Sequence, residues 1–207
     1  EYAGRDIDTV ITTRELTQMI RAAHINPATL QDIESDRPMQ DGSGAGVIFG
    51  ATGGVMEAAL RTAYYLLKGE NPDADAFKVV RSPGFQENHG VMEAEFQIDD
   101  IRVRTAVVSG LGNTRSLLEK IERGEVQYDF VEVMACPGGC VGGGGQPIHD
   151  GEELAFERGK NLYELDQKSE IRFSHENQDI TRMYEEYFEK PMSHKAHMLL
   201  HTEHKVR

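Results

Sequence analysis

Two cysteines are the residues of this chain best suited to chemistry. Cys136 and Cys140 lie four apart in the stretch "EVMACPGGCVGGGGQP", residues 132–147, and they are the only cysteines in 207 residues. A disulfide between them would close a very small ring with little entropic benefit, and two cysteines do not make a disulfide framework. Metal ligation, redox chemistry and simple burial are the remaining interpretations.

Glycines surround the two thiols. Gly138 and Gly139 let the chain fold back after Pro137, so that Cys140 can approach the same centre as Cys136. The glycines at 142–145 let backbone N–H groups approach a bulky anion, and such donors tune the potential of iron–sulfur centres. Zinc sites more often use closer cysteine spacing with further ligands. The pattern therefore favours iron–sulfur chemistry, with two buried thiols beside a glycine turn as the plain alternative.

Four histidines near the end of the chain form a second candidate cluster. They follow spacings of three, four and three, which a helix would place on one face: His194, His197, His201 and His204. Imidazoles so arranged could bind a divalent metal. No carboxylate is positioned to orient them, so packing or surface display is the favoured interpretation. Ser174 is a candidate helix cap, with His175 and Glu176 beside it in the same capping role.

The hydrophobic patterning predicts alternating strands and helices. Strands are expected at 8–13, 47–54, 91–98, 101–108 and 128–135, the third and fourth as a hairpin or neighbouring strands. Helices are expected after a Thr12–Glu15 capping box and at 55–69, 110–124, 151–168, 175–189 and part of the tail. Gly69 is a candidate C-terminal cap of the second helix. This order predicts an α/β fold: a parallel or mixed sheet lobe flanked by helices over 1–150, with a helical C-terminal extension over 151–207.

Charge and hydropathy exclude two partner classes. The formal net charge of -13 repels phosphate backbones, so we expect no nucleic-acid partner. No apolar run reaches membrane-spanning length, so we expect no membrane span. The first residues carry no signal-peptide pattern. The chain does not begin with Met, so we expect the natural N-terminus upstream. The expected compartment is the cytoplasm, with the periplasm as the alternative.

The full strings are more specific than the cysteine spacing. "VMACPGGCVGGGGQP" closely resembles the third cysteine motif of the iron-only, or FeFe, hydrogenases. "DIDTVITTREL", "SGAGVIFGATGGVMEAALRTA" at 43–63 and "SHENQDITRMYEEYFEKPMSHKAHMLLHTEH" resemble further family segments in the expected order. The resemblance covers nearly the whole chain. It implies that 1–150 is the C-terminal lobe of the hydrogenase catalytic domain.

The resemblance also implies a cofactor and its ligands. The family's H-cluster joins a four-iron cubane to a diiron unit through one cysteine sulfur. By resemblance, Cys136 binds only the cubane, Cys140 bridges the two units, and Met134 packs beside the diiron unit. Gly53 and Gly54 match a turn near the diiron ligands, where a helix N-terminus would favour anionic groups. The alternatives are core packing for Met134 and an ordinary strand-to-helix turn or phosphate cradle for the glycines.

The chain departs from the family pattern on its N-terminal side. Two further cubane cysteines, a cysteine thought to relay protons and a lysine that contacts the diiron unit are missing. The expected function is therefore part of a hydrogenase that interconverts protons, electrons and H2, with the H-cluster absent or incomplete and no turnover from these residues alone. The expected partners are the N-terminal remainder of the enzyme and a ferredoxin, a flavodoxin-like carrier or a nicotinamide-linked subunit. The alternative functions are a hydrogen sensor, an iron–sulfur assembly scaffold, or a purely structural piece.

Overall fold

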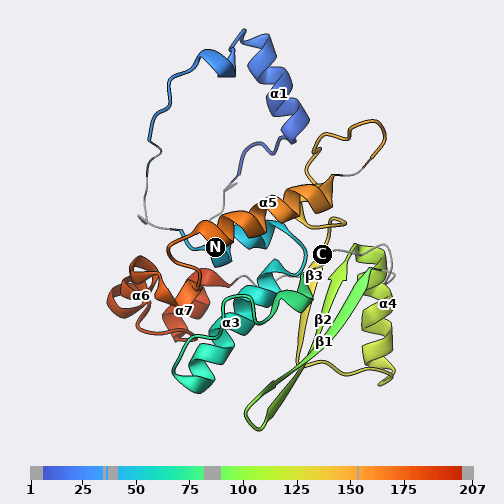
Figure 1. Ribbon diagram of the computed structural model, residues 1–207, viewed down its shortest axis with the longest axis vertical. Coiled ribbons are helices and arrows are strands. Elements are labelled where there is room, and N and C mark those ends of the chain that lie inside the picture. Colours follow the sequence, from blue (N-terminus) through green and yellow to red (C-terminus); the bar gives the residue numbers. More distant parts are fainter. Residues whose placement is uncertain (1–6, 35, 37–41, 82–89, 153, 202–207) are drawn as a thin grey trace.

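A small sheet with a helix packed on each face lies at one side of the molecule (Figure 1). The computed structural model describes residues 7–34, 36, 42–81, 90–152 and 154–201. Most of the helices from the C-terminal part of the chain lie on the side of the molecule away from the sheet, and an N-terminal helix stands apart from both. The predicted α/β class with C-terminal helices is confirmed. The predicted division into 1–150 and 151–207 stays a prediction.

In the described part of the chain, the sheet has three strands: β1 (Val91–Ile98), β2 (Ile101–Ser109) and β3 (Phe130–Met134). β1 and β2 are antiparallel and form the predicted hairpin. β3 runs parallel to β2, with Ser109 opposite Met134 at the end of the ladder. A parallel pair needs a crossover connection, and helix α4 (Leu111–Glu122) provides it. The sheet is therefore mixed, and β3 ends two residues before Cys136.

The two faces of the sheet bury separate clusters, because successive residues of a strand point to opposite sides. One face packs against helix α3 (Gly54–Lys68) in a cluster of Met56, Leu60, Phe77, Val80 and Val107. The other face packs against α4 in a cluster of Ala106, Val108 and Leu117. Helix α3 ends at Gly69, whose φ of 72° confirms the predicted C-terminal cap. The sheet and α3 thus form the rigid support for the cysteine-bearing segment.

The C-terminal helices were largely predicted. They are α5 (Ala155–Lys168), α6 (Gln178–Met183), a π-helical turn η6 (Tyr184–Phe188) and α7 (His194–Leu200). Short helical turns connect the larger elements: α2 (Gly44–Val47), η1 (Pro27–Thr29), η2 (Ile48–Gly50), η3 (Lys78–Val80), η4 (Cys140–Gly142) and η5 (Ser174–Glu176). Among the described helices, none combines the length and hydropathy needed to span a bilayer.

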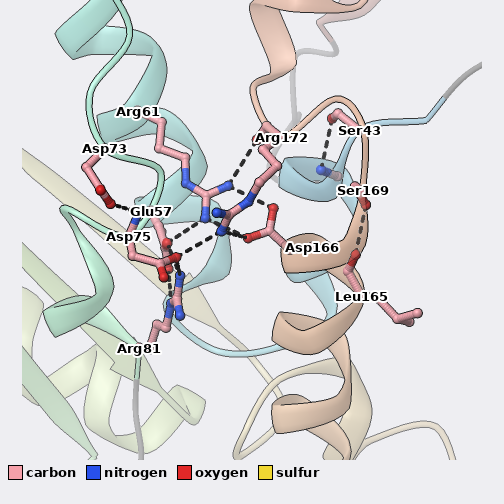
Figure 2. Close-up of polar contacts among 11 residues, drawn as sticks. Ser43, Glu57, Arg61, Asp73, Asp75, Arg81, Leu165, Asp166, Ser169 and Arg172 are labelled. Carbon is pink, nitrogen blue, oxygen red and sulfur yellow. Dashed lines mark hydrogen bonds and ion pairs between the residues drawn. The ribbon is translucent and has the colours of Figure 1, made fainter.

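Six buried or partly buried charged side chains join α3 to α5 (Figure 2). They alternate in sign around a closed ring: Glu57, Arg61, Asp166, Arg172, Asp75 and Arg81. Within it, Arg61 donates to both oxygens of Asp166 at 3.0 and 2.8 Å, and the side chains of this pair are fully buried. The three positive and three negative groups cancel, so the ring buries charge without a net excess. It fastens the C-terminal helices to the sheet-bearing lobe.

Residues 7–34 form an N-terminal arm, none of whose side chains is buried. Its helix α1 (Thr13–Ala22) begins with the predicted capping box: the Thr12 hydroxyl accepts from the Glu15 backbone and the Glu15 carboxylate accepts from the Thr12 backbone. The arm exposes many large apolar side chains, among them Ile7, Val10, Leu16, Met19, Leu30 and Ile33. Such a surface is typical of a segment that packs on something beyond the described residues.

Three predictions about local structure are wrong. Residues 8–13 form no strand: none of the described strands pairs with them, and Thr13 is already the first residue of the helix α1. The predicted strand at 47–54 is instead the end of α2 followed by η2, because Ser43 caps a helical turn whose Gly44 packs against α5. Ser174 is not the cap of the helix predicted at 175–189: Asn177 accepts from the backbone N–H groups of Asp179 and Ile180, and that helix starts at residue 178.

Candidate functional site

The cysteine loop, residues 136–143, follows β3, and both of its cysteines are free and exposed residues. Its own backbone closes it: Gly139 N–H donates to the Cys136 carbonyl at 3.0 Å, and Gly143 N–H donates to the Cys140 carbonyl at 3.1 Å. Gly138 and Gly139 have φ values of 81° and 95°, a left-handed region that side chains strongly disfavour. The predicted fold-back after Pro137 is therefore present.

Gly143 brings backbone very close to one thiol. A Cβ atom placed at this glycine would lie 2.6 Å from the Cys136 Sγ atom, which is too close for any side chain. Residue 143 must therefore be glycine, because any side chain there would clash with the Cys136 sulfur atom. A soft thiolate with main chain packed against it suits an iron–sulfur ligand, so the residues present fit the group that the sequence predicts.

The cysteine loop rests on the segment that precedes α3. The Thr52 N–H donates to the Gly138 carbonyl at 3.2 Å, and the Ser109 hydroxyl accepts from the Gly138 N–H at 3.0 Å. A Cβ atom at Gly139 would lie 2.7 Å from the Gly50 carbonyl oxygen. The loop and the turn at 50–54, called the glycine turn below, are therefore packed backbone against backbone.

The glycine turn needs its glycines for contacts with its own chain. A Cβ atom at Gly53 would lie 2.0 Å from the Val80 carbonyl oxygen, and one at Gly54 would lie 1.7 Å from the Ile48 carbonyl oxygen. Both glycines are buried beneath the cysteine loop. The structure thus gives them a packing requirement of their own, and their predicted contact with a cofactor stays a prediction.

A buried carboxylate occupies the N-terminus of α3. Glu132 of β3 accepts from Gly53 N–H at 2.7 Å with one oxygen and from Met56 N–H at 2.6 Å with the other. Burial raises the pKa of the Glu132 carboxyl, and these two N–H donors oppose that rise. Two donors that the sequence analysis left available for anionic ligands are therefore already used by the protein.

The role of Glu132 was not predicted from the sequence, although the sequence carries a signal for it. The strand FVEVM places one carboxylate in the middle of an apolar run that reads as buried. A buried charge requires partners, and a helix N-terminus offers N–H donors. Met134, by contrast, lies where it was predicted, at the end of β3 beside the cysteine loop, and is half-buried. Its proposed contact with a diiron unit stays a prediction.

The N-terminal arm contacts the glycine run directly after the cysteine loop. Thr13 N–H donates to the Gly144 carbonyl at 2.9 Å, and the Arg14 Nε atom donates to the Gly145 carbonyl at 3.0 Å. A Cβ atom at Gly145 would lie 2.7 Å from the Thr12 side chain. The carbonyls of Gly144 and Gly145 therefore hold the N-terminus of α1, and the approach of the backbone N–H groups at 142–145 to an anion stays a prediction.

The three histidines of the cluster that the structure describes, His194, His197 and His201, belong to no group of three or more side chains arranged to hold a metal ion. The rings of His197 and His201 stack with centroids 5.0 Å apart, and both His194 and His201 are exposed. His204 lies outside the described residues. In the part of the chain that the structure describes, no three or more histidine, cysteine, aspartate or glutamate side chains are arranged to hold a metal ion. The two cysteines are thus a partial ligand set.

Comparison with known proteins identifies the family. The family model for the iron-only hydrogenase large subunit, C-terminal domain, matches residues 1–144, and the model for the iron hydrogenase small subunit matches residues 152–207. This chain belongs to the iron-only hydrogenase family, as the cysteine strings predict. Its fold, its cysteine loop and its C-terminal helices are those of one part of that family's proteins.

Individual relatives agree. The chain is 46% identical to the NADP-reducing hydrogenase subunit HndD of Solidesulfovibrio fructosivorans, over 95% of this chain and 33% of that protein. It resembles the solved structure HydA(deltaEFG), which shows stepwise H-cluster assembly in an FeFe hydrogenase, with a TM-score of 0.71 and 42% identity over 96% of this chain and 56% of the other. It is also 30% identical to the cytosolic Fe-S cluster assembly factor narfl of Xenopus tropicalis, over 99% of this chain and 42% of that protein.

These alignments cover only part of each relative. The chain spans about a third of the hydrogenase subunit and a little over half of the solved chain. The activity of a whole hydrogenase is accordingly a proposal for this chain.

Proposed function

We propose that this chain forms one part of the catalytic domain of an iron-only hydrogenase, with Cys136 and Cys140 as two thiolate ligands of its H-cluster. Cys136 would hold only the four-iron cubane, and Cys140 would bridge the cubane to the diiron unit. The observation that carries the proposal is a folded loop, hydrogen-bonded to the protein interior at Gly138, in which both cysteines are free and exposed residues. When bound, the H-cluster supplies the iron centre at which two protons and two electrons combine to form H2.

The chain's own residues would hold and shield the cluster. Thiolates bind iron strongly, and the glycines of the cysteine loop leave room for a bulky group beside them. Met134 would present a polarisable, apolar thioether that cannot protonate a neighbouring ligand. Gly53 and Gly54 stay part of the proposed cofactor site because they belong to the glycine turn. That turn packs directly beneath the cysteine loop.

We propose that the other cluster ligands come from residues beyond these 207, in the same natural chain or in a partner subunit. A cubane takes four protein ligands, and two cysteines supply half of them. The exposed apolar side chains of the N-terminal arm support this view, because they offer a surface for further protein beside the cysteine loop.

A complementation experiment tests the proposal. The chain is produced anaerobically alone and together with the preceding part of an iron hydrogenase, and iron content, electron paramagnetic resonance and H2 evolution are measured. We expect no H2 from the chain alone and H2 with a cluster signal from the complemented protein. Cys136→Ser and Cys140→Ser should abolish both signals. Ala76→Ser, which introduces the same side chain at an exposed turn, should leave them unchanged. Full activity in both cysteine variants would exclude them as ligands.

An assembly scaffold is the second candidate, and the 30% identity to an Fe-S cluster assembly factor supports it. The higher identity to a hydrogenase subunit favours catalysis. In the same experiment, a cysteine-dependent cluster that forms without any H2 turnover, and that can be transferred to an apo-protein, would favour the scaffold.

The electron partner is proposed from the same comparison. One hydrogenase relative is an NADP-reducing subunit, which supports a nicotinamide-linked partner for this chain, with ferredoxin or a flavodoxin-like carrier as the alternatives. Rates of H2 uptake by the complemented protein with each purified acceptor would distinguish them.

A further inference from the structure

Glu132 connects the strand that leads to the first cysteine with the turn that supports the cysteine loop. It lies on β3 four residues before Cys136, and its side chain is buried. Its two carboxylate oxygens accept one N–H each, from Gly53 at 2.7 Å and from Met56 at 2.6 Å. Gly53 is the N-cap residue of α3 and has no side chain to supply this contact. A strand residue therefore caps the helix from across the fold.

The contact continues directly into the cysteine loop. Thr52, next to Gly53, donates its N–H to the Gly138 carbonyl midway between the two cysteines. Gly139 is packed so closely on the same turn that a Cβ atom there would lie 2.8 Å from the Thr52 nitrogen. A shift of the glycine turn must therefore move or release the loop.

A carboxyl group can satisfy both donors, because each of its two oxygens can accept one N–H. The N-terminus of α3 adds the favourable field of its helix dipole. Glutamine has nearly the same size but only one oxygen, and its amide group would meet the second N–H with another donor. The substitution Glu132→Gln thus removes one of the two hydrogen bonds while it keeps the volume of the side chain nearly unchanged.

We propose that Glu132 is a positioning residue for the cysteine pair, holding the glycine turn against β3 so that Cys136 and Cys140 are presented in one fixed arrangement. The purpose of that arrangement rests on the proposed function above. The coupling of the glycine turn to the cysteine loop does not depend on that function, and it can be tested without iron.

The test compares backbone amide exchange in the full 207-residue chain and in two variants. In E132Q, hydrogen exchange at 49–57 and at 136–143 should accelerate together by at least tenfold, because hydrogen bonds to a charged group are among the stronger ones. The control Leu117→Ala removes a buried side chain on the opposite face of the sheet. It should accelerate exchange mainly around α4. The ratio of the exchange rates in the cysteine loop to those in the rest of the sheet should stay unchanged.

Two results would overturn the proposal. Faster exchange at 49–57 with the cysteine loop unchanged would mean that Glu132 only caps α3. An acceleration in E132Q with the same distribution as in L117A would mean that it contributes only to global stability. If E132Q does not fold, amide exchange of the unmodified chain in mild denaturant tests the coupling instead. The amides of Thr52, Gly138 and Gly139 must then show one common free energy of opening. A cysteine loop that opens separately refutes the coupling.

A second measurement uses the complemented, iron-loaded protein. E132Q should change the electron paramagnetic resonance line shape of the cluster, while L117A should not, since only the former alters how the thiols are held. If no cluster forms even with the unmodified chain, the proposed function fails, but the exchange result stands. If the cluster forms and its spectrum is identical in E132Q, the positioning role fails while the proposed function stands.

Discussion

Ser109 and Gly138 are joined by a hydrogen bond of 3.0 Å in which the serine hydroxyl accepts from the glycine N–H. Ser109 is the last residue of β2 and is buried, whereas Gly138 lies between the two cysteines. The opposite polar group of Gly138, its carbonyl, accepts from Thr52. The centre of the cysteine loop is thus held from both sides by segments far away in the sequence, which explains how an exposed loop of glycines can keep one conformation.

Removing this hydroxyl should loosen the loop. We expect Ser109→Ala to lower the free energy of unfolding by about 1–2 kcal/mol, because the Gly138 N–H loses its partner. Alkylation of Cys136 by iodoacetamide should also become faster. The matched control is Ser116→Ala, the same change on an exposed position of α4, which should stay within about 0.5 kcal/mol. Equal effects of the two variants in urea unfolding and alkylation would contradict the role of Ser109.

Local patterning predicted most of the fold, and it failed where tertiary contacts decide. The hairpin at 91–98 and 101–108 and helix α3 follow from strong periodicity and a glycine cap. The segment "VIFGATGG" carries the same apolar signal as a buried strand. Its first four residues are helical and the next three form a turn, because Gly44 allows α5 to approach so closely that a Cβ atom there would lie 2.3 Å from an Asp166 oxygen. A contact between residues more than a hundred apart is invisible to a local pattern.

The sequence pointed to the cysteines of the candidate site but not to the residues that support them. The cysteine strings alone identified the thiols and the family. Of the alternating ring of charges, only one ion pair could be predicted from the sequence. It joins Glu57 and Arg61, which are four residues apart on one helix. Its remaining members come from three other segments. Glu132 similarly required knowledge that β3 ends beside the N-terminus of α3.

Gly54, the first residue of α3, and Gly69, its C-terminal cap, should differ sharply in how well they tolerate substitution by alanine. In Gly54→Ala the new Cβ atom would lie 1.7 Å from the Ile48 carbonyl oxygen, so backbone must move. We expect a loss of more than about 4 kcal/mol or no folding. Gly69→Ala meets no atom within 4 Å and has only its positive φ to oppose it, which costs about 1 kcal/mol. Thermal unfolding by circular dichroism measures both, and a mild effect at Gly54 would refute the close approach.

Breaking the buried charge ring should destabilise the protein far more than breaking an exposed ion pair. Asp166→Asn leaves Arg61 buried with one carboxylate fewer, and we expect a loss of about 3–5 kcal/mol. Glu125→Gln breaks the pair with Arg123, both of which are exposed, and should have no measurable effect on unfolding. Urea titrations of the two variants at low and high salt check this, and the large loss in Asp166→Asn should persist in high salt because the pair is shielded from solvent.

His175 should make the protein less stable in mild acid. Its ring stacks on Tyr65, Nε2 lies 2.7 Å from the Asn71 Oδ1 atom and Nδ1 lies 3.2 Å from the Thr62 hydroxyl. This arrangement suits the neutral ring with its proton on Nε2. Burial lowers the pKa of His175 below its ordinary value, and nearby Glu176 opposes the shift only in part.

The sign of the pH effect follows from this depressed pKa. The unfolded chain takes up the proton near the ordinary histidine pKa of about 6.5, and the folded chain takes it up only at lower pH. The stability due to His175 is therefore fully present above that value and is lost as the pH falls toward the folded pKa. Urea midpoints measured between about pH 5 and 8 should decline in acid for the unmodified chain and decline less for His175→Gln. His149→Gln, at an exposed position, should keep the full decline, and identical slopes in all three proteins would show that another group is responsible.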